Sequence, residues 1–166
     1  FTQGEIIMCG CFALKNPRAL YTVLNRLEIP EIKPRSHIRP GEPEGVLIVR
    51  KPKGGTSIHL DRLKWGFRVT KDKPFAPINA RAETLFQKWP WRNAALHHRC
   101  LIPMDGFYEP KGPKKQKNRP QYYFQLPDEK IFFVAGIWAP PITADDLDTF
   151  SLITTSPNHQ VSPIHD

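Results

Sequence analysis

Apolar residues in this chain occur in short runs, and proline or glycine separates most of these runs. Short runs rich in β-branched and aromatic side chains are typical of β-strands. The clearest of them cover 121–126, 131–138 and 149–155, and further ones cover 9–14, 46–50, 57–60, 63–69 and 99–103. The pattern therefore predicts about eight strands, two of them joined in a hairpin through the glycine-containing turn at 51–55.

Helical spacing is less frequent. Asn16-Pro17 is suited to begin a helix, and Leu20, Val23, Leu24 and Leu27 follow at i, i+3, i+4 and i+7. A second short helical segment is expected after 78–84 and ends at about Trp89, while 29–44 is predicted to be an extended loop. Strands outnumber helices without strict alternation. The predicted fold is therefore α+β and mainly β, a rolled or barrel-like antiparallel sheet with a few short helices.

The chain has 166 residues, which is the size of one domain with a real core. Its 18 prolines favour many short elements joined by stiff loops. We expect a single domain over 8–166, with residues 1–7 as a leader or added segment before Met8.

Lysine and arginine exceed aspartate and glutamate by eight, which favours an anionic partner such as nucleic acid, although a merely basic surface would give the same charge. Lys51 and Lys53, and the segment 111–119, supply basic loops. No apolar run approaches the ~20 residues of a membrane span, and no secretory signal is evident. We expect a cytoplasmic monomer that does not enter a membrane.

The cysteines and histidines do not have the spacing of a zinc site, and no glycine-rich phosphate loop is present. We therefore expect no metal and no cofactor. With three cysteines and no export signal, a disulfide framework is also not expected.

Cys9 carries the most specific chemistry in the sequence. If Met8 and the residues before it were removed, Cys9 would present an amine of pKa ~7.7–8.0 beside a thiol of pKa ~8.5. Such a pair captures aldehydes, because the amine forms a Schiff base and the thiolate then closes a five-membered thiazolidine ring. The simpler interpretation is that Cys9 is a small buried hydrophobic residue that opens a strand.

Four polar residues are candidates to assist this chemistry. Glu109 ends an aromatic segment after a turn, where partial desolvation would let it hold or deliver a proton, although a surface or ion-paired glutamate is the alternative. Asn79 and Arg81 stand at i and i+2 and could orient a neutral polar group and a phosphate. His165 is a possible proton carrier, and a peptidase pair with Cys9 is chemically possible.

Six motifs in order resemble the SRAP domain, the SOS-response-associated peptidase family that includes the 5-hydroxymethylcytosine-binding, embryonic-stem-cell-specific protein. The motifs are Met8-Cys9-Gly10, Trp65-Gly66-Phe67, Ile78 to Thr84, Arg99 to Pro103, Gly106-Phe107-Tyr108-Glu109 and Ile164-His165-Asp166. Each motif alone has little specificity, whereas all six in this order are highly specific.

The resemblance implies a β-rich fold with a basic cleft that binds single-stranded DNA and shields abasic sites through a covalent crosslink. It implies that Cys9 is the nucleophile, that Asn79 holds the N-terminal region and the sugar, that Glu109 is the acid and base, and that His165 assists ring opening and reversal. Arg81 and Pro40 would lie along the DNA, and we add Arg39, Lys51 and Lys53 as basic or flanking positions.

The family continues beyond the position of Asp166, so the resemblance implies that the C-terminus is truncated. Two further departures from the family pattern change the expected DNA contacts. Cys11 stands where the family usually has arginine, so one phosphate contact is absent or supplied elsewhere. Arg68-Val69-Thr70-Lys71 stands where family members carry aromatic residues that wedge bases.

The sequence thus predicts a DNA-damage-response protein that traps abasic sites in single-stranded DNA as a thiazolidine crosslink. Such a protein would associate with the nucleoid when it acts on DNA. Whether it is an enzyme in the strict sense stays open, because crosslinking, a lyase-like step and a proposed autoproteolytic activity would all use Cys9. The alternatives are a cysteine peptidase and a noncovalent reader of nucleic acid or modified bases.

Overall fold

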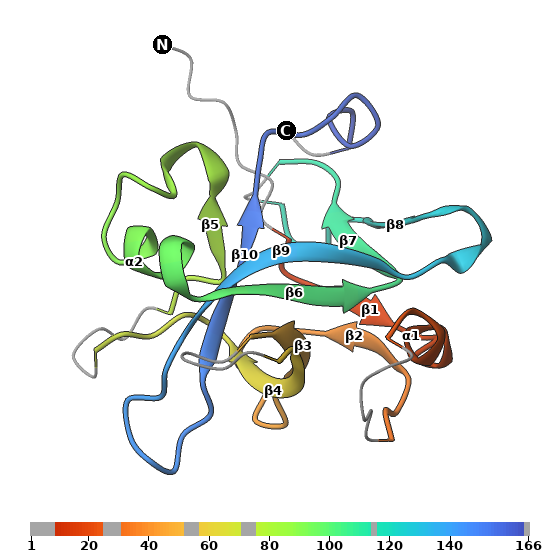
Figure 1. Cartoon of the computed structure of the whole chain (residues 1–166). Helices are drawn as coiled ribbons and strands as arrows, with labels where there is room; N and C mark the ends of the chain where they lie inside the picture. The colour runs from red at the N-terminus through yellow and green to blue at the C-terminus, as the bar shows by residue number, and fades with distance from the viewer. Residues whose placement is uncertain (1–8, 25–30, 52–56, 71–75, 114–115, 165–166) are drawn as a thin grey trace.

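The computed structural model describes residues 9–24, 31–51, 57–70, 76–113 and 116–164 (Figure 1). Within these ranges it contains ten strands, two α-helices and two short 3-10 helices. The elements are β1 (Phe12–Leu14), α1 (Arg18–Val23), β2 (Arg35–Ile38), β3 (Val46–Arg50), β4 (His59–Trp65), β5 (Asn79–Arg81), η1 (Ala82–Thr84), α2 (Trp91–His97), β6 (Arg99–Met104), β7 (Gly106–Pro110), β8 (Gln121–Gln125), η2 (Pro127–Glu129), β9 (Phe132–Ala139) and β10 (Thr149–Thr154).

Five strands close into a barrel in the order β4-β3-β6-β9-β10, because β10 also pairs with β4. β5 pairs with β10 as an additional strand beside the barrel. The predicted α+β, mainly β, barrel-like fold is confirmed. Two of the pairings, β10 with β4 and β10 with β5, are parallel, which the sequence pattern did not predict.

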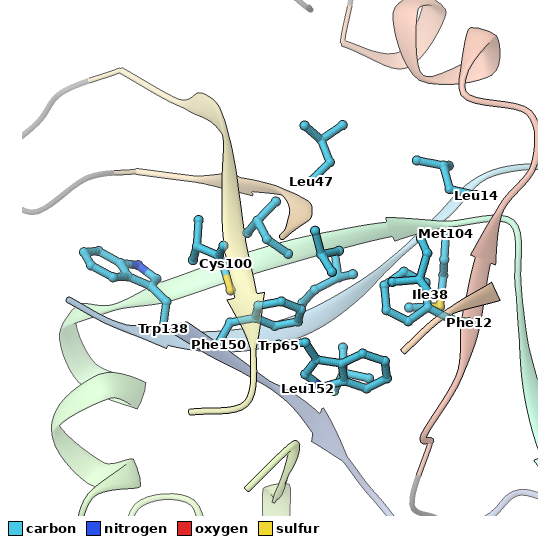
Figure 2. Packing of buried hydrophobic residues seen from close by; sticks show 14 of the residues in the cluster. Phe12, Leu14, Ile38, Leu47, Trp65, Cys100, Met104, Trp138, Phe150 and Leu152 are labelled. Carbon is cyan, nitrogen blue, oxygen red and sulfur yellow. The ribbon is translucent and has the colours of Figure 1, made fainter. Parts of the chain in front are cut away.

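A second sheet has four strands in the order β2-β1-β7-β8, all antiparallel. It meets the barrel through β1, where the ring of Phe12 lies 5.2 Å from the ring of Trp65. Figure 2 shows Phe12 beside Ile38 and Met104 in the main core, with Trp65, Phe150 and Leu152 of the barrel grouped next to them. The barrel and the second sheet therefore share one hydrophobic core.

Several local predictions were wrong. The segment 29–44 contains strand β2 rather than only loop, and the strand predicted over 9–14 begins at Phe12. The strand predicted over 63–69 ends at Trp65, because Gly66 takes a φ of +131°, a conformation that side-chain-bearing residues rarely adopt.

The helices also differ from the prediction. α1 is described over Arg18–Val23 without a side-chain cap from Asn16, and Leu27 lies outside the described residues. α2 was not predicted. It begins at Trp91, two residues after the predicted break, and buries Ala94 and Ala95 against β9 and β6. The apolar pattern of α2 is short and consists mainly of alanine, so it could not be distinguished from the neighbouring loop in the sequence.

Neither α-helix in the described ranges is long or apolar enough to cross a membrane. Within the same ranges, no group of three or more histidine, cysteine, aspartate or glutamate side chains could hold a metal ion.

Candidate functional site

Cys9 lies just before β1, at the place where the chain enters the shared core. Its side chain is buried, and the thiol donates a weak hydrogen bond to the carbonyl oxygen of Cys11 at 3.6 Å. Burial, together with the negative charge of Glu109, raises the pKa of the Cys9 thiol to about 12. The thiol is therefore neutral near pH 7. The prediction that Cys9 and Cys11 lie in one strand is wrong, and Cys11 is the more exposed of the two.

Asn79 opens strand β5 and fixes the backbone of Cys9. Its side-chain amide donates a hydrogen bond to the Cys9 carbonyl oxygen at 3.2 Å, across 70 positions of sequence. Its own amide oxygen, Oδ1, is buried and accepts no hydrogen bond from any described residue. Since buried acceptors are nearly always satisfied, this oxygen is available to a ligand group that donates a hydrogen bond.

Glu109 is fully buried on strand β7, so the alternative of a surface glutamate is wrong. Strand alternation puts it on the same face as Phe107, which packs against the shared core. It is close enough to Cys9 for its charge to be the second cause of the raised thiol pKa. A fully buried carboxylate beside a nucleophile is rare in a core, and it is the usual arrangement of a proton-transfer group.

Thr154 is a polar residue of this region that the sequence did not single out. In the parallel pair of β10 and β5 it stands opposite Arg81, while Leu152 stands opposite Asn79. Its hydroxyl is buried and has no hydrogen-bond partner among the described residues. Only strand register could reveal it, because nothing in the local sequence distinguishes this threonine from other strand residues.

The structure therefore brings Cys9, Asn79 and Glu109 together from the N-terminal segment, β5 and β7. Arg81 lies two residues beyond Asn79 on the same strand, half-exposed and paired with Glu83 at 3.3 Å. His165 lies outside the described residues, and its predicted role stays a prediction.

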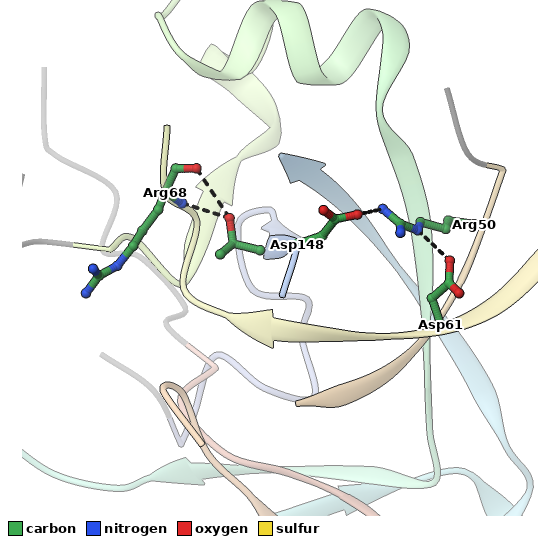
Figure 3. Close-up of polar contacts among 5 residues, drawn as sticks. Arg50, Asp61, Arg68 and Asp148 are labelled. Atoms are coloured by element: carbon green, nitrogen blue, oxygen red, sulfur yellow. Dashed lines mark hydrogen bonds and ion pairs between the residues drawn. The ribbon is translucent and has the colours of Figure 1, made fainter. Parts of the chain in front are cut away.

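The other predicted DNA-binding residues are more widely spread. Exposed Arg39 and half-buried Pro40 directly follow β2, whose Ile38 stands opposite Phe12 in β1, so they lie near the Cys9 segment. Lys51 follows Arg50, which is held between Asp61 and Asp148 on the β3 and β10 side of the barrel (Figure 3). Lys53 is outside the described ranges.

A closed β-barrel with a buried cysteine, an asparagine bonded to its backbone and a buried glutamate beside it defines a thiol-centred site. The family model for SOS response associated peptidase (SRAP) matches residues 8–166. The chain belongs to this family.

Relatives with assigned names agree with this membership. The chain is 30% identical over 169 residues to the abasic site processing protein YoaM of Bacillus subtilis (strain 168), which covers 96% of this chain and 72% of that protein. It is 30% identical over 170 residues to the abasic site processing protein YedK of Escherichia coli (strain K12), with 96% and 72% covered.

A solved structure has the same fold. The crystal structure of a phage-related protein from Bordetella bronchiseptica aligns with a TM-score of 0.69 and 26% sequence identity, over 89% of this chain and 69% of that chain.

Proposed function

We propose that this protein processes abasic sites in DNA, and that it does so by binding single-stranded DNA and forming a thiazolidine crosslink through Cys9. The observation that carries the proposal is that Asn79 and Glu109 flank Cys9, one holding its carbonyl and the other acting on its thiol. The names of the relatives, all abasic site processing proteins, support the same reaction class.

The order of the chemical steps follows from the state of the thiol. With a pKa of about 12 the Cys9 thiol keeps its proton, so the free α-amine is the first nucleophile. The amine adds to the aldehyde carbon of the opened abasic sugar and expels one water, which gives an imine. The sulfur then bonds to the same carbon, the thiol proton leaves, and the imine nitrogen gains a proton. One water is lost in total.

Glu109 is placed to move the proton in the second step. As the carbon–sulfur bond forms, the carboxylate accepts the thiol proton, and the protonated acid can return a proton to the nitrogen. A buried base of this kind is effective because no water competes for the proton. The two free acceptors, Asn79 Oδ1 and Thr154 Oγ1, are suited to the hydroxyl groups of the opened sugar.

The reaction requires that residues 1–8 be removed, because an amide nitrogen cannot form an imine. Methionine removal suffices if Met8 is the natural first residue. Self-cleavage by Cys9 is the second route, and the family description as a peptidase favours it. Intact mass separates the two routes, since the full chain would lose residues 1–8 on standing only in the second case and only with Cys9 present.

The experiment that tests the proposal is intact-mass analysis of a chain beginning at Cys9 after incubation with an abasic single-stranded oligonucleotide. The expected product is protein plus oligonucleotide minus one water. It should resist heating, and the chain that still carries Phe1 should not form it. A heat-stable adduct of equal yield on the chain that retains Phe1 would refute the aminothiol mechanism.

A further inference from the structure

An exposed aromatic surface lies at the start of α2, next to the strand that carries Asn79. Trp89 is 66% exposed and Phe86 is 57% exposed, which are the largest exposed fractions among the described large hydrophobic side chains. Trp91, two residues later, packs inward with its ring 4.9 Å from the ring of Phe67. This inward contact anchors the beginning of α2, so Trp89 is presented to solvent from a fixed support.

Trp89 forms one wall of a small cavity of about 160 Å³, which Arg68, Val69, Pro77 and Pro90 also line. This volume is below the range of about 300–1,000 Å³ that is typical of sites for whole small molecules, so the cavity is suited to one planar ring. A neighbouring cavity of about 500 Å³ shares Phe67, Val69 and Pro90 with it, and we call these two adjoining cavities the Trp89 groove.

The charged residues around this groove favour an anionic partner. No aspartate or glutamate is among the described residues that line either cavity. Arg68 is exposed, and Figure 3 shows its guanidinium pointing away from the backbone contacts that its residue makes with Thr149. Lys88 and Arg92 are exposed on either side of Trp89 in the sequence. Aromatic faces among cations are the arrangement that binds single-stranded nucleic acid.

The groove is also close to the candidate site along the chain. Pro77 lies two residues before Asn79, and its carbonyl accepts hydrogen bonds from the Phe67 backbone and the Ser151 hydroxyl. Two residues of chain span at most about 7 Å, so the Pro77 wall of the cavity lies within that distance of Asn79 along the chain. A strand that places its abasic sugar at Cys9 can therefore reach Trp89 with a base only a few nucleotides away.

We propose that the Trp89 groove binds a nucleobase of the single strand on one side of the abasic site, by stacking on Trp89 with Arg68 at the adjacent phosphate. In this chain the groove would supply the aromatic contact that the segment 68–71 lacks. The inference rests on the proposed function only for the position of the abasic site, since stacking itself needs no covalent chemistry.

The test measures binding of an undamaged single-stranded oligonucleotide by fluorescence anisotropy. Trp89→Ala should weaken binding about 5- to 150-fold, the range for one lost stacking contact, and Trp89→Phe should recover most of it. The salt dependence should keep its slope in Trp89→Ala and decrease by about 0.7 in Arg68→Ala. Leu96→Ala is the matched control, because Leu96 is exposed on α2 and lines neither cavity.

Two abasic oligonucleotides, each with flanking nucleotides on one side only, give the polarity. The Trp89→Ala effect should be confined to one of them, and equal loss with both would show a disturbed fold and overturn the inference. If Trp89→Ala binds undamaged DNA as tightly as the parent does, the inference is also overturned, and a protein partner is left as the occupant of the Trp89 groove. If the parent protein does not crosslink abasic DNA but its binding of single strands still depends on Trp89, the proposed function is refuted and the inference about the Trp89 groove stands.

Discussion

The surroundings of two buried cysteines, Cys9 and Cys100, differ in a way that separates a reactive site from a core. Burial is the first cause of a raised pKa in both thiols, to about 12 in each. The second cause has opposite sign, because the Glu109 charge raises the pKa of Cys9 while the Arg50 charge lowers that of Cys100.

The backbones of the two cysteines differ as well. Cys100 is the second residue of β6, in the barrel wall between β3 and β9, and a side chain on the neighbouring Gly136 would touch its sulfur. Cys9 lies outside any strand and is held by the side chain of Asn79. The comparison shows that thiol burial alone says little about function, whereas a neighbouring proton acceptor and a backbone held by a side chain point to chemistry.

The largest expected effect on adduct formation comes from replacing each of the two cysteines with alanine in separate variants. In a chain that begins at residue 9, Cys9→Ala should abolish the heat-stable adduct and leave at most an imine that borohydride can trap. Cys100→Ala should form the adduct within about twofold of the parent and lose stability by roughly 1–2 kcal/mol, as expected for a small core truncation. Intact mass and urea unfolding give the two readouts. Equal adduct yield in both variants would contradict the assignment of Cys9 as the reactive thiol and Cys100 as a core residue.

The second largest effect on adduct formation is expected from replacing the Glu109 carboxylate with an amide. Glu109→Gln should slow stable adduct formation by about 10²–10⁴-fold, since proton transfer contributes that much. It should also lower the pKa of the Cys9 thiol, although burial keeps it above its usual value, and so raise its alkylation rate above pH 8. Asp105→Asn is the control.

Asp105 is also a buried acid, but it accepts hydrogen bonds from the Tyr123 hydroxyl and from the backbone of Lys15 and Asn16. Its loss should reduce stability and leave the adduct rate per folded molecule unchanged. A rate loss of the same size in both variants would mean that Glu109 acts only through the fold.

The third effect concerns the positioning of Cys9. Asn79→Ala removes one hydrogen bond to the Cys9 carbonyl and one free acceptor, which should reduce adduct formation about tenfold. Asn16→Ala is the matched control and should react as the parent does, because Asn16 is exposed and its side chain does not cap α1. Gel quantification of initial rates measures the difference, and a parent-like rate for Asn79→Ala would remove Asn79 from the site.

The fourth effect is a pH dependence of stability that both cysteines share. Their folded-state pKa values are raised, so the folded protein holds these protons more tightly than the unfolded chain. The resulting stability is complete below about pH 9 and is lost as the pH rises toward about 12. Cys100→Ala should therefore lose less stability than the parent between about pH 8 and pH 10.5 in urea unfolding. An equal loss would contradict the assignment.

The smallest effect is electrostatic. Arg81→Ala should reduce the slope of the logarithm of single-strand affinity against the logarithm of salt concentration by about 0.7, the amount for one phosphate contact. Lys51→Ala is the comparison variant. Lys51 follows Arg50 on the Asp61 and Asp148 side of the barrel, so its slope tests whether DNA passes along that side. Anisotropy titrations measure both slopes. A larger change for Lys51 than for Arg81 would move the DNA path away from Cys9.

Strand existence could be predicted from the sequence, because alternating and β-branched runs such as 131–138 and 149–155 match β9 and β10 within about one residue. The short elements could not. β2 and α2 have four and seven residues, and their patterns are too brief to separate from loops. The parallel pairing of β10 with β4 and β5 depends on how distant segments meet, which local patterns do not contain.

The sequence by itself determined the family resemblance, the mainly β class and the residue types Cys9, Asn79 and Glu109, since these depend on local identity and order. Only the tertiary structure decided that the three meet, because their contacts span up to 100 positions and require the barrel and the β7 sheet to share a core. It alone decided that Glu109 is fully buried, that Cys9 keeps its proton, and that Trp89 faces outward while Trp91 packs inward. Burial and electrostatic environment are properties of packed neighbours, and a linear sequence does not specify those neighbours one residue at a time.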